Sequence, residues 1–580
     1  MGIQIGGLAS GLDTDAIVKE LMQAEQVRVD KVEQDKTLAE WTRDAYNEIN
    51  QKFAEFIIST RESFGLTDSS SGVLLNKSVS SLKWIKGANS SNATVAQVSA
   101  RADAVNGSYQ INVKQLATNW SAASGGAISE NAIHGDRSNL QSQFALEEND
   151  KIHFEIATKN KSIEVFIDNI TGIESNSYVQ IKDKEGNIIN RIDLEGDTSN
   201  ISLSDLVKQI NQTNIGVTAI YDETIDRFFL QTSETGLENT IQIIEYDVDG
   251  VPISGGGFFD KLNLQHNNNG KIENIILNTQ YAGQNAIIDF GAAQNISQSS
   301  NQFTVNNIHF DLKSTGLTTV MVSTNEDAVI EKITDFVDKY NDLVEEVNKL
   351  LSQKRYREYP PLTKAQRDEM KEKEIELWEE KAKSGLLRND SIIHRTLQRM
   401  RSGLYEKVQG MEGDLDALTK IGITTQTYSS GSAGGKLTID EKKLREAIRK
   451  DVDGVIQLLF KQPDPSITEE TEKRENTGLI SRLYGDLITG MKEIIAKAGP
   501  GDDSELYRNV NSSMLIDFVT NQSSISMLDK NIINYEKRIL DLERRFKDIE
   551  SRYWSQFTAM EKALASMNAQ SNWLYQQLGM

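Results

Sequence analysis

Hydrophobic positions at the two ends of the chain repeat with the spacing of long α-helices. Asp13 is a predicted N-cap, with Asp15 favourably placed in the first turn, and no proline or internal glycine follows until after Phe64. Steps of three and four residues from Val18 meet mostly apolar side chains, although charged residues interrupt the series. The pattern predicts one helix over residues 13–64.

The same stepping gives a cleaner apolar stripe near the C-terminus, from Leu528 to Leu574. It predicts a helix roughly 75 Å long at about 1.5 Å per residue. A stripe of this length needs a second long helix beside it, and the N-terminal helix is the candidate. We expect the two ends to pair as a coiled coil. Its predicted core residues are Val18, Val32, Ile49, Phe53, Leu528, Ile532, Tyr535, Ile539, Leu542, Phe546 and Ile549.

The last part of this helix has an unusual composition. The stretch "YWSQFTAMEKALASMNAQSNWLYQQLGM" carries only two charged residues, Glu561 and Lys562, and is rich in aromatic side chains. A helix that is apolar or neutral almost all round is typical of burial on several sides. An internal coiled coil is one interpretation. A helix pair that also packs against other protein chains is the other.

Strand patterns fill the middle of the chain, from about residue 70 to 325. In "KIHFEIATKNKSIEVFI" two alternating runs flank a turn near Asn160, and further hairpins are predicted to turn at 185–186 and 269–270. These hairpins indicate antiparallel sheet in two modules. One short helix, "SLSDLVKQINQ", interrupts them and is opened by Ser202 or by Ser204.

Helical pattern returns at "NEDAVIEKITDFVDKYNDLVEEVNKLL". Pro360 and Pro361 then mark a break inside a highly charged segment, residues 354–383, which is typical of a solvated helix or an exposed excursion. The chain therefore combines helical ends, a further helical region and a β-rich middle.

Composition narrows the classes of function. A chain of 580 residues exceeds the usual size of one core, so several domains are expected. Its formal charge of -22, without a basic block, disfavours nucleic acid as a partner. The absence of cysteine excludes disulfides and thiolate sites. Neither a membrane span nor a secretory signal is found, so a conventional interpretation is a cytoplasmic protein without membrane insertion.

The sequence does not match the motifs of phosphate-binding loops or of histidine metal sites. "SGSAGGKL" has Ser430 and Leu437 where a phosphate-binding loop needs glycine and a hydroxyl residue. The histidines show no pairing at metal-ligand spacing. They are His134, His153, His266, His309 and His394. We therefore expect no enzyme activity, no cofactor, and no catalytic or metal site.

Several long stretches together carry a family resemblance. They are "GGLASGLDTDAIVKELMQAEQVRVDKVEQDKTLAEWTRDAYNEIN" at the start, "GSYQINVKQLA" and "GKLTIDEKKLREAI" inside, and "YWSQFTAMEKALASMNAQSNWLYQQLG" at the end. In this order they resemble the flagellar hook-associated protein 2 family, the filament cap proteins. The region 121–282 resembles the family least.

The resemblance implies a non-enzymatic assembly protein outside the cell, at the distal tip of the bacterial flagellum. Members form a homo-oligomeric ring and help incoming flagellin subunits to fold and insert. The ring is a pentamer or a hexamer, and periodicity does not decide which. The family is exported unfolded with an uncleaved N-terminal signal, after contact with an export chaperone, which overturns the cytoplasmic interpretation.

The resemblance also implies a multidomain α+β fold, with the paired terminal helices as a coiled-coil leg and two antiparallel β-rich domains inserted in the middle. The expected parts are a terminal leg (1–42 and 525–580), a helix-rich domain (43–68 and 326–524), an inner β domain (69–120 and 283–325) and an outer β domain (121–282).

Apolar residues at both ends are the expected contacts with flagellin or neighbouring cap subunits. They are Leu8, Leu12, Leu21, Phe557, Trp573 and Leu574. Two alternatives stay open at this point. One is another flagellar axial component, such as a hook–filament junction protein. The other is a surface adhesin whose exposed β modules bind host or matrix glycans, an activity that is compatible with capping.

Overall fold

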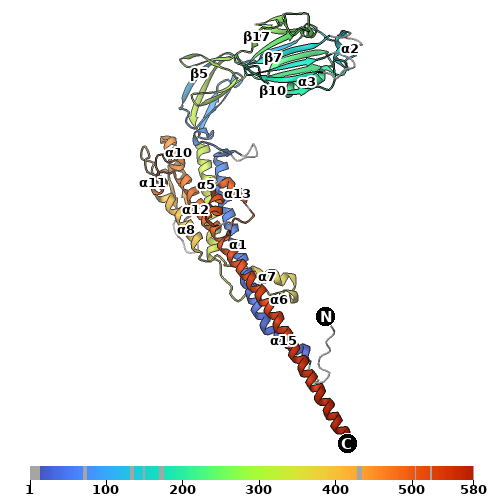
Figure 1. Cartoon of the computed structure of the whole chain (residues 1–580). Coiled ribbons are helices and arrows are strands. Elements are labelled where there is room, and N and C mark those ends of the chain that lie inside the picture. Colours follow the sequence, from blue (N-terminus) through green and yellow to red (C-terminus); the bar gives the residue numbers. More distant parts are fainter. Residues whose placement is uncertain are drawn as a thin grey trace. The chain divides into compact units, whose positions relative to one another are not determined.

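The chain divides into two units in the computed structural model, which we describe separately (Figure 1). The helical unit comprises Met1–Ile85 and Asn325–Met580, and the β unit comprises Lys86–Thr324. The residues that the structure describes are 13–68, 75–130, 136–147, 150–168, 176–268, 270–426, 434–502, 504–511, 513–522 and 525–578.

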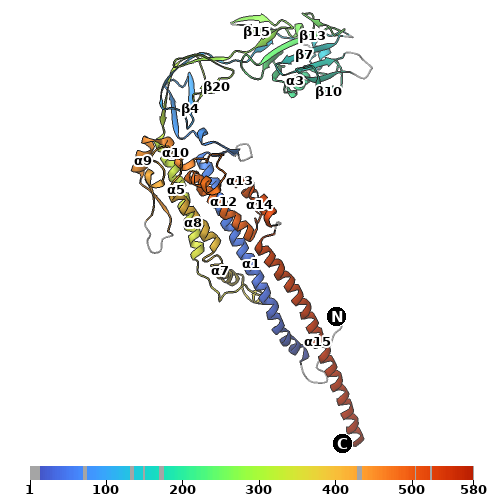
Figure 2. The ribbon, with the colours of Figure 1, turned by 60° about the vertical axis from the view of Figure 1, so that its left-hand side comes forward.

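Two long helices from opposite ends of the sequence form the frame of the helical unit. Helix α1 spans Thr14–Phe64, and α15 spans Met527–Leu578. The Asp13 side chain accepts a hydrogen bond of 2.9 Å from the backbone N–H of Ala16, and α1 ends at Gly65, whose φ of 74° suits a residue without Cβ. The predicted helix and its cap are therefore confirmed. The two helices run side by side in Figures 1 and 2.

Shorter helices pack around the C-terminal half of α1. Helices α5 and α12 contact α1 directly, and α8 packs on α12. The other helices that the described residues of this unit form are α5 (Glu326–Ser352), α6 (Lys364–Glu369), α7 (Glu372–Lys383), α8 (Ser391–Tyr405), α9 (Glu441–Lys450), α10 (Val452–Phe460), α11 (Glu470–Glu475), α12 (Leu479–Ala498), α13 (Ser504–Val510) and α14 (Ser513–Gln522). Its described residues also form two short antiparallel strand pairs, β1–β2 (Thr67–Asp68, Leu75–Asn76) and β23–β24 (Ile423–Thr425, Leu437–Ile439), and two short 3-10 helices, Val79–Ser81 and Leu418–Ile421.

A buried arginine joins three of these helices. The side chain of Arg482, on α12, is fully buried and donates hydrogen bonds only to backbone carbonyl oxygens. The acceptors are the carbonyls of Gly403, Glu406, Lys407, Arg474, Glu475 and Thr477, at 2.9–3.4 Å. They lie at the end of α8 and in and after α11, where helix carbonyls lack intrahelical partners. One planar guanidinium thereby donates hydrogen bonds to backbone carbonyl groups of two chain segments at once.

The β unit is built from antiparallel sheets, and every strand pair among its described residues is antiparallel. The largest sheet has the order β10-β9-β8-β7-β13-β14, with β17 also paired to β13. Two five-stranded sheets follow the orders β11-β12-β6-β15-β16 and β19-β18-β5-β22-β3, and a smaller sheet is β20-β21-β4. The strands are β3 (Lys86–Ser90), β4 (Ala96–Ala100), β5 (Gly107–Gln115), β6 (Ser121–Ser124), β7 (Ile152–Thr158), β8 (Lys161–Ile167), β9 (Tyr178–Asp183), β10 (Ile188–Asp193), β11 (Val217–Asp222), β12 (Arg227–Thr232), β13 (Thr240–Tyr246), β14 (Pro252–Ile253), β15 (Leu264–Asn268), β16 (Lys271–Asn274), β17 (Gln280–Ala282), β18 (Ala286–Phe290), β19 (Ala293–Gln298), β20 (Gln302–Val305), β21 (Ile308–Leu312) and β22 (Gly316–Thr324).

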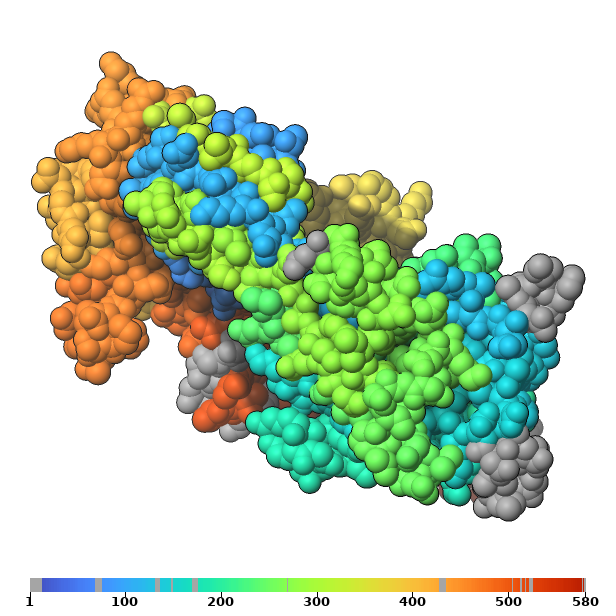
Figure 3. All heavy atoms as spheres, turned by 90° about the horizontal axis from the view of Figure 1, so that it is seen from above, coloured from blue at the N-terminus to red at the C-terminus, as the bar shows by residue number. Residues whose placement is uncertain are grey.

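Two separate hydrophobic cores stabilise this unit, one face of which is visible in blue to green in the space-filling view of the whole chain in Figure 3. One core draws its buried residues from 120–277, and the other from 95–117 and 286–322. Short helices α2 (Leu140–Phe144), α3 (Leu203–Gln212) and α4 (Phe258–Leu262) contribute to the first core. Ser202 closes a capping box at the start of α3. The expected α+β class, with paired terminal helices and antiparallel sheets between them, is confirmed.

Three of the predicted hairpins can be followed strand by strand. Strands β7 and β8 pair around the turn at Asn160, and β9 and β10 pair around 185–186. Strands β15 and β16 also pair, and Gly270, which directly precedes β16, has a φ of 91°. The other predicted turn residue, Asn269, lies outside the described residues.

A charged residue inside the largest sheet is held by four partners. The Glu164 carboxylate, on β8, lies 2.8 Å from His153 Nε2, 2.6 Å from Lys182 Nζ, 2.5 Å from Gln180 Nε2 and 3.2 Å from the Tyr178 hydroxyl. The hydrogen bond with His153, together with those from Lys182 and Gln180, holds the pKa of Glu164 well below its ordinary 4.5 despite burial. The ionised form of Glu164 therefore stabilises the fold.

Replacing Arg482 with leucine should lower the free energy of unfolding of the helical unit by about 3 kcal/mol, because several buried carbonyls lose their donor. Arg482→Lys should also destabilise, since an ammonium group cannot reach both segments. Arg449→Leu is the matched control, because Arg449 is an exposed arginine in a surface ion pair with Glu326 and should cost less than about 1 kcal/mol. Urea unfolding of all three variants measures this, and equal losses for Arg482→Leu and Arg449→Leu would contradict the assignment.

Glu164→Gln should destabilise the β unit by about 2 kcal/mol at pH 7. The pKa of Glu164 is lower in the folded than in the unfolded state, so its contribution is complete above about pH 5 and is lost as the pH falls below 4.5. The stability gap between wild type and variant should therefore close in acid. Hydrogen exchange of the β7–β9 amides across this pH range measures it. Glu238→Gln, at an exposed ion pair with Lys159, is the control and should show no comparable gap.

Candidate assembly interface

The pairing of α1 with α15 is antiparallel and has a defined register. Lys36 Nζ lies 3.1 Å from Glu536 Oε1, and Arg43 Nη1 lies 3.4 Å from Asp529 Oδ1. In both ion pairs the two residue numbers add to 572, as expected for two helices that run in opposite directions without slipping. The hydrogen bond with Glu536 raises the pKa of Lys36, which is consistent with a formed pair. This register places Met527, the first residue of α15, opposite position 45 of α1.

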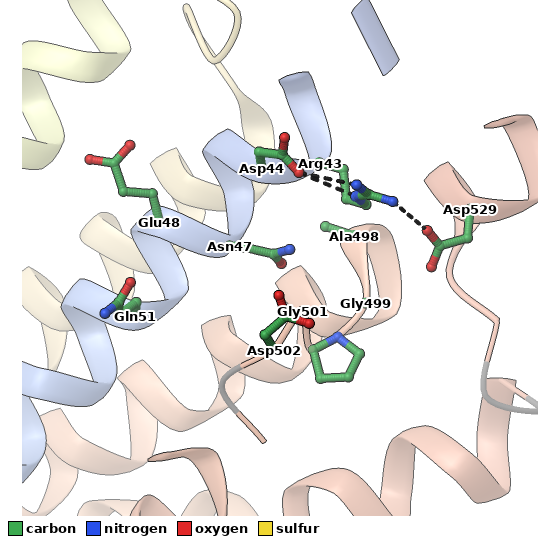
Figure 4. Close-up of a pocket in the computed structure, with 11 residues that line it drawn as sticks. Arg43, Asp44, Asn47, Glu48, Gln51, Ala498, Gly499, Gly501, Asp502 and Asp529 are labelled. Carbon is green, nitrogen blue, oxygen red and sulfur yellow. Dashed lines mark hydrogen bonds and ion pairs between the residues drawn. The ribbon is translucent and has the colours of Figure 1, made fainter. Parts of the chain in front are cut away.

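We call α15 and residues 14–45 of α1 the leg. Residues 46–64 of α1 and helices α5 and α8–α14 of the helical unit are the body. Body and leg meet at a polar cleft of about 540 Å³, shown in Figure 4. Residues of α1, the segment that follows α12, and Asp529 of α15 line it. Ser526 accepts a hydrogen bond from the Asp529 N–H and donates one to its carboxylate, which starts α15 beside the Arg43 guanidinium.

The cleft does not have the features of a chemical site. Its side chains are mostly acidic or amide groups, with Arg43 already paired to Asp44 and Asp529. Across the part of the chain that the structure describes, no group of three or more His, Asp or Glu residues is arranged to hold a metal ion. None of the helices in the same described ranges is both long enough and apolar enough to cross a membrane.

The C-terminal end of α15 extends past the start of α1. The register places Thr14, the first residue of α1, opposite position 558. Residues 559–578 of α15, about 30 Å of helix, lie beyond this point. We call them the overhang. Four large apolar side chains there have exposed fractions of 52–62%: Met567, Trp573, Leu574 and Tyr575.

The predicted coiled-coil residues fall into three groups. Val18, Val32, Leu528 and Ile532 are buried, whereas further along α15 the predicted positions are only half-buried. The half-buried ones are Tyr535, Ile539, Leu542, Phe546 and Ile549. Ile49 and Phe53 are buried too, but the register places them past the first residue of α15, on the part of α1 that packs on α5 and α12. They belong to the core of the body and not to the coiled coil, because α15 begins too late to reach them.

The row of buried residues along α1, its seam, also contains two residues that were not predicted. Met22 and Val29 are buried, together with Val18 and Val32. The buried positions of α1 therefore follow steps of four and then three residues from Val18, and not steps of three and then four. Leu21, one position away, is 40% exposed. The signal was present in the sequence, because both step orders fit a heptad starting at Val18. Only the position of the partner helix chooses between them.

The predicted interface residues lie at one end of the leg as far as the structure describes them. Trp573 and Leu574 are exposed on the overhang, and Phe557 is half-buried just before it. Leu21 lies on α1, opposite position 551 in the register. Leu8 and Leu12 lie outside the described residues. Exposed Leu540, on the paired part of α15, was not among the predicted residues.

Comparison with known proteins connects this architecture to one family. Residues 10–120 match the model for the flagellar hook-associated protein 2 N-terminus, and residues 283–569 match the model for its C-terminus. The chain is 35% identical over 591 aligned positions to the flagellar hook-associated protein 2 of Halalkalibacterium halodurans, covering 98% of each chain. A flagellar hook-associated protein 2 of Thermotoga maritima is 28% identical, over 45% of this chain and 39% of that one.

A solved structure is similar at lower identity. It is the crystal structure of the D1-D2-D3 domains of the flagellar cap protein FliD from Escherichia coli, with 18% sequence identity and a TM-score of 0.46. The match covers 78% of this chain and 95% of that chain.

The register of the leg can be tested with cysteine pairs, because the natural chain has no cysteine. Lys36→Cys with Glu536→Cys should be cross-linked almost completely within one chain by a short bismaleimide, since the two positions face each other. Lys36→Cys with Lys562→Cys is the control, because the register separates these positions by about 39 Å along the leg. Gel mobility of the dilute protein reports the products. Efficient intramolecular linking of the control pair would contradict the antiparallel register.

Proposed function

The chain belongs to the flagellar hook-associated protein 2 family, whose members cap the flagellar filament, and we propose that it does so by inserting the overhang of α15 between flagellin subunits. It is a structural protein of the flagellum and not an enzyme. It acts at the filament tip with flagellin as its partner. A hook–filament junction protein and an adhesin are not favoured by a relationship that extends over the full length of a hook-associated protein 2.

One observation carries the proposed role of the overhang. Trp573, Leu574 and Tyr575 are consecutive residues on one turn of α15, and more than half of each side chain is exposed. Large exposed apolar groups that cluster at one place mark protein interaction surfaces, and tryptophan and tyrosine are the side chains most often found at the centre of such interfaces. The surrounding helix is almost free of charge, so its burial against another chain carries little desolvation cost.

The paired part of the leg differs from the overhang in the way that this role requires. Between Leu528 and Glu550 the outer surface of α15 is dense in charged side chains, which suits contact with water. Beyond Tyr553 only Glu561 and Lys562 are charged. The change in composition occurs close to position 558, where the pairing with the described part of α1 ends. Composition and geometry thus select the same segment.

The wider assembly follows from family membership and is part of the proposal. The chain forms a homo-oligomeric ring, pentameric or hexameric, above the growing end of the filament. It promotes folding and insertion of flagellin beneath this ring. It is exported without a cleaved signal peptide, after binding a chaperone, and works outside the cell. In this proposal residues 1–42 and 525–580 form a terminal leg domain, which includes the overhang, and residues 121–282 form the outer β domain.

Trp573→Ala combined with Leu574→Ala should abolish capping without unfolding the protein. Both side chains are exposed, so the melting temperature and helix content of the purified chain should stay unchanged. Loss of interface hot spots costs about 2 kcal/mol or more each, so cells that carry the variant should shed unpolymerised flagellin into the medium.

Leu540→Ala is the matched control, since Leu540 is an equally exposed apolar residue on the paired part of α15. Its cells should grow normal filaments. Immunoblots of culture medium and electron microscopy of filaments measure both variants. Normal filaments in the double variant would refute the role of the overhang.

A further inference from the structure

Residues 353–388, between α5 and α8, fold into a small module that we call the bracket. It contains α6, α7 and the pair Pro360–Pro361, and it lies beside the upper part of the leg (Figures 1 and 2). Its ends are held close together: Arg355 donates to the carbonyls of Ala382 and Ser384, and the Ser384 hydroxyl donates to the carbonyl of Lys354 at 2.8 Å. The bracket is therefore a closed loop with its own internal contacts.

The two prolines connect the bracket to the leg. Trp378, on α7, donates its indole N–H to the carbonyl of Pro360 at 2.7 Å. The Gln34 amide, on α1, donates to the carbonyl of Pro361 at 2.8 Å. Proline has a fixed φ and no N–H, so the short segment keeps an extended shape and offers only its carbonyls. Adjacent carbonyls thus join α7 on one side and α1 on the other.

A second contact lies two helical turns further along α1. The Lys383 ammonium group stands 4.9 Å from the centre of the Trp41 ring. Gln34 and Trp41 are seven residues apart, so they share one face of α1. Next to Gln34, burial and the nearby carboxylates of Asp30 and Glu543 raise the pKa of Glu33, and the positive charges of Lys36 and Lys364 partly oppose this rise.

The opposite face of α1 carries the contacts with α15. Lys36 and Arg43 are also seven residues apart, and each lies two positions after Gln34 or Trp41. Two residues correspond to about 200° of rotation on an α-helix, so the two pairs point in nearly opposite directions. Helix α1 is therefore held between α15 on one side and the bracket on the other, as Figure 2 shows.

Burial along α1 reflects this arrangement. From 14 to 31 exposed side chains alternate with a buried seam, as in a helix with a single neighbour. From 32 to 43 every side chain is buried or half-buried, and none is classed as exposed. The bracket thus covers the stretch in which α1 passes from the leg to the body. The body end is tied as well, because the Tyr46 hydroxyl donates to Asp390 at the start of α8.

From these contacts we propose that the bracket is a clamp that holds α1 straight where the leg leaves the body. Long helices are rarely straight, and in a lone two-helix leg each helix is supported on one face only. With the bracket in place, force on the leg reaches the body through two faces of α1. The leg keeps a constant direction during the repeated steps of assembly. The clamp itself is a property of the isolated chain and does not depend on the proposed capping role.

Hydrogen–deuterium exchange of the full purified chain tests the clamp. Trp378→Ala removes the internal anchor of the bracket, and the amides of residues 31–45 should then exchange about tenfold faster. Gln34→Ala removes only the hydrogen bond to Pro361 from the surface of α1, and should accelerate the same amides about threefold without changing α7. The amides of α12, in the body, should be unaffected in both variants.

Leu377→Ala is the matched control, since Leu377 is the neighbour of Trp378 and half of its side chain is exposed. It should leave exchange in residues 31–45 unchanged. The proposal is overturned if Trp378→Ala opens α7 while residues 31–45 keep their protection, because pairing with α15 would then be sufficient. It is also overturned if Leu377→Ala and Trp378→Ala accelerate these amides equally.

Discussion

The antiparallel contact between α1 and α15 is the constraint on which the helical unit depends. Neither helix buries its apolar stripe alone, and long isolated helices gain most of their stability from packing. The contact joins the two ends of the sequence, so it cannot form until the chain is complete. The two interhelical ion pairs contribute little energy at a partly exposed surface. They mark the register, while Val18, Met22, Val29 and Val32 supply buried apolar area.

A single helix, α1, has three different environments along its length. It offers one seam to α15 near its start, is covered on two faces beside the bracket, and contributes to the core of the body near its end. In the body its aromatic residues meet those of other helices, as in the contact of Phe64 with Phe336 and Phe460. Because one continuous helix connects these parts, a displacement at the leg is transmitted to the body with little local bending.

The β unit has its own hydrophobic cores. It is inserted between Ile85 and Asn325, and its two cores are formed entirely from its own strands and short helices. The carboxylate of Glu164, on β8, is satisfied by residues of the neighbouring strands β7 and β9. The two cores of the β unit are thus built from its own residues, whereas the residues of the candidate assembly interface come from the helical unit.

Much of this fold was predictable because it depends on local periodicity. The bounds of α1, the Asp13 cap and the hairpins around Asn160 and 185–186 follow from spacing and turn chemistry between near neighbours. For the short helix α3 the sequence left Ser202 and Ser204 open as caps, and the structure selects Ser202. The low charge of the C-terminal part of α15 is likewise visible in the residues themselves, although the sequence left open whether this part is covered within the chain or packs against other chains.

Features that depend on a distant partner were decided only by the tertiary structure. The heptad from Val18 allows two step orders, and the position of α15 selects Met22 and Val29. Ile49 and Phe53 fit the predicted stripe, but they pack in the body because α15 begins opposite position 45. The charged segment 354–383 was expected to be a solvated helix or an exposed excursion, and its helices α6 and α7 are largely exposed. The contacts of the bracket with Gln34 and Trp41 were not predicted, because they join residues more than 300 positions apart. Periodicity determines which face of a helix is apolar, whereas only the packed chain determines what covers that face.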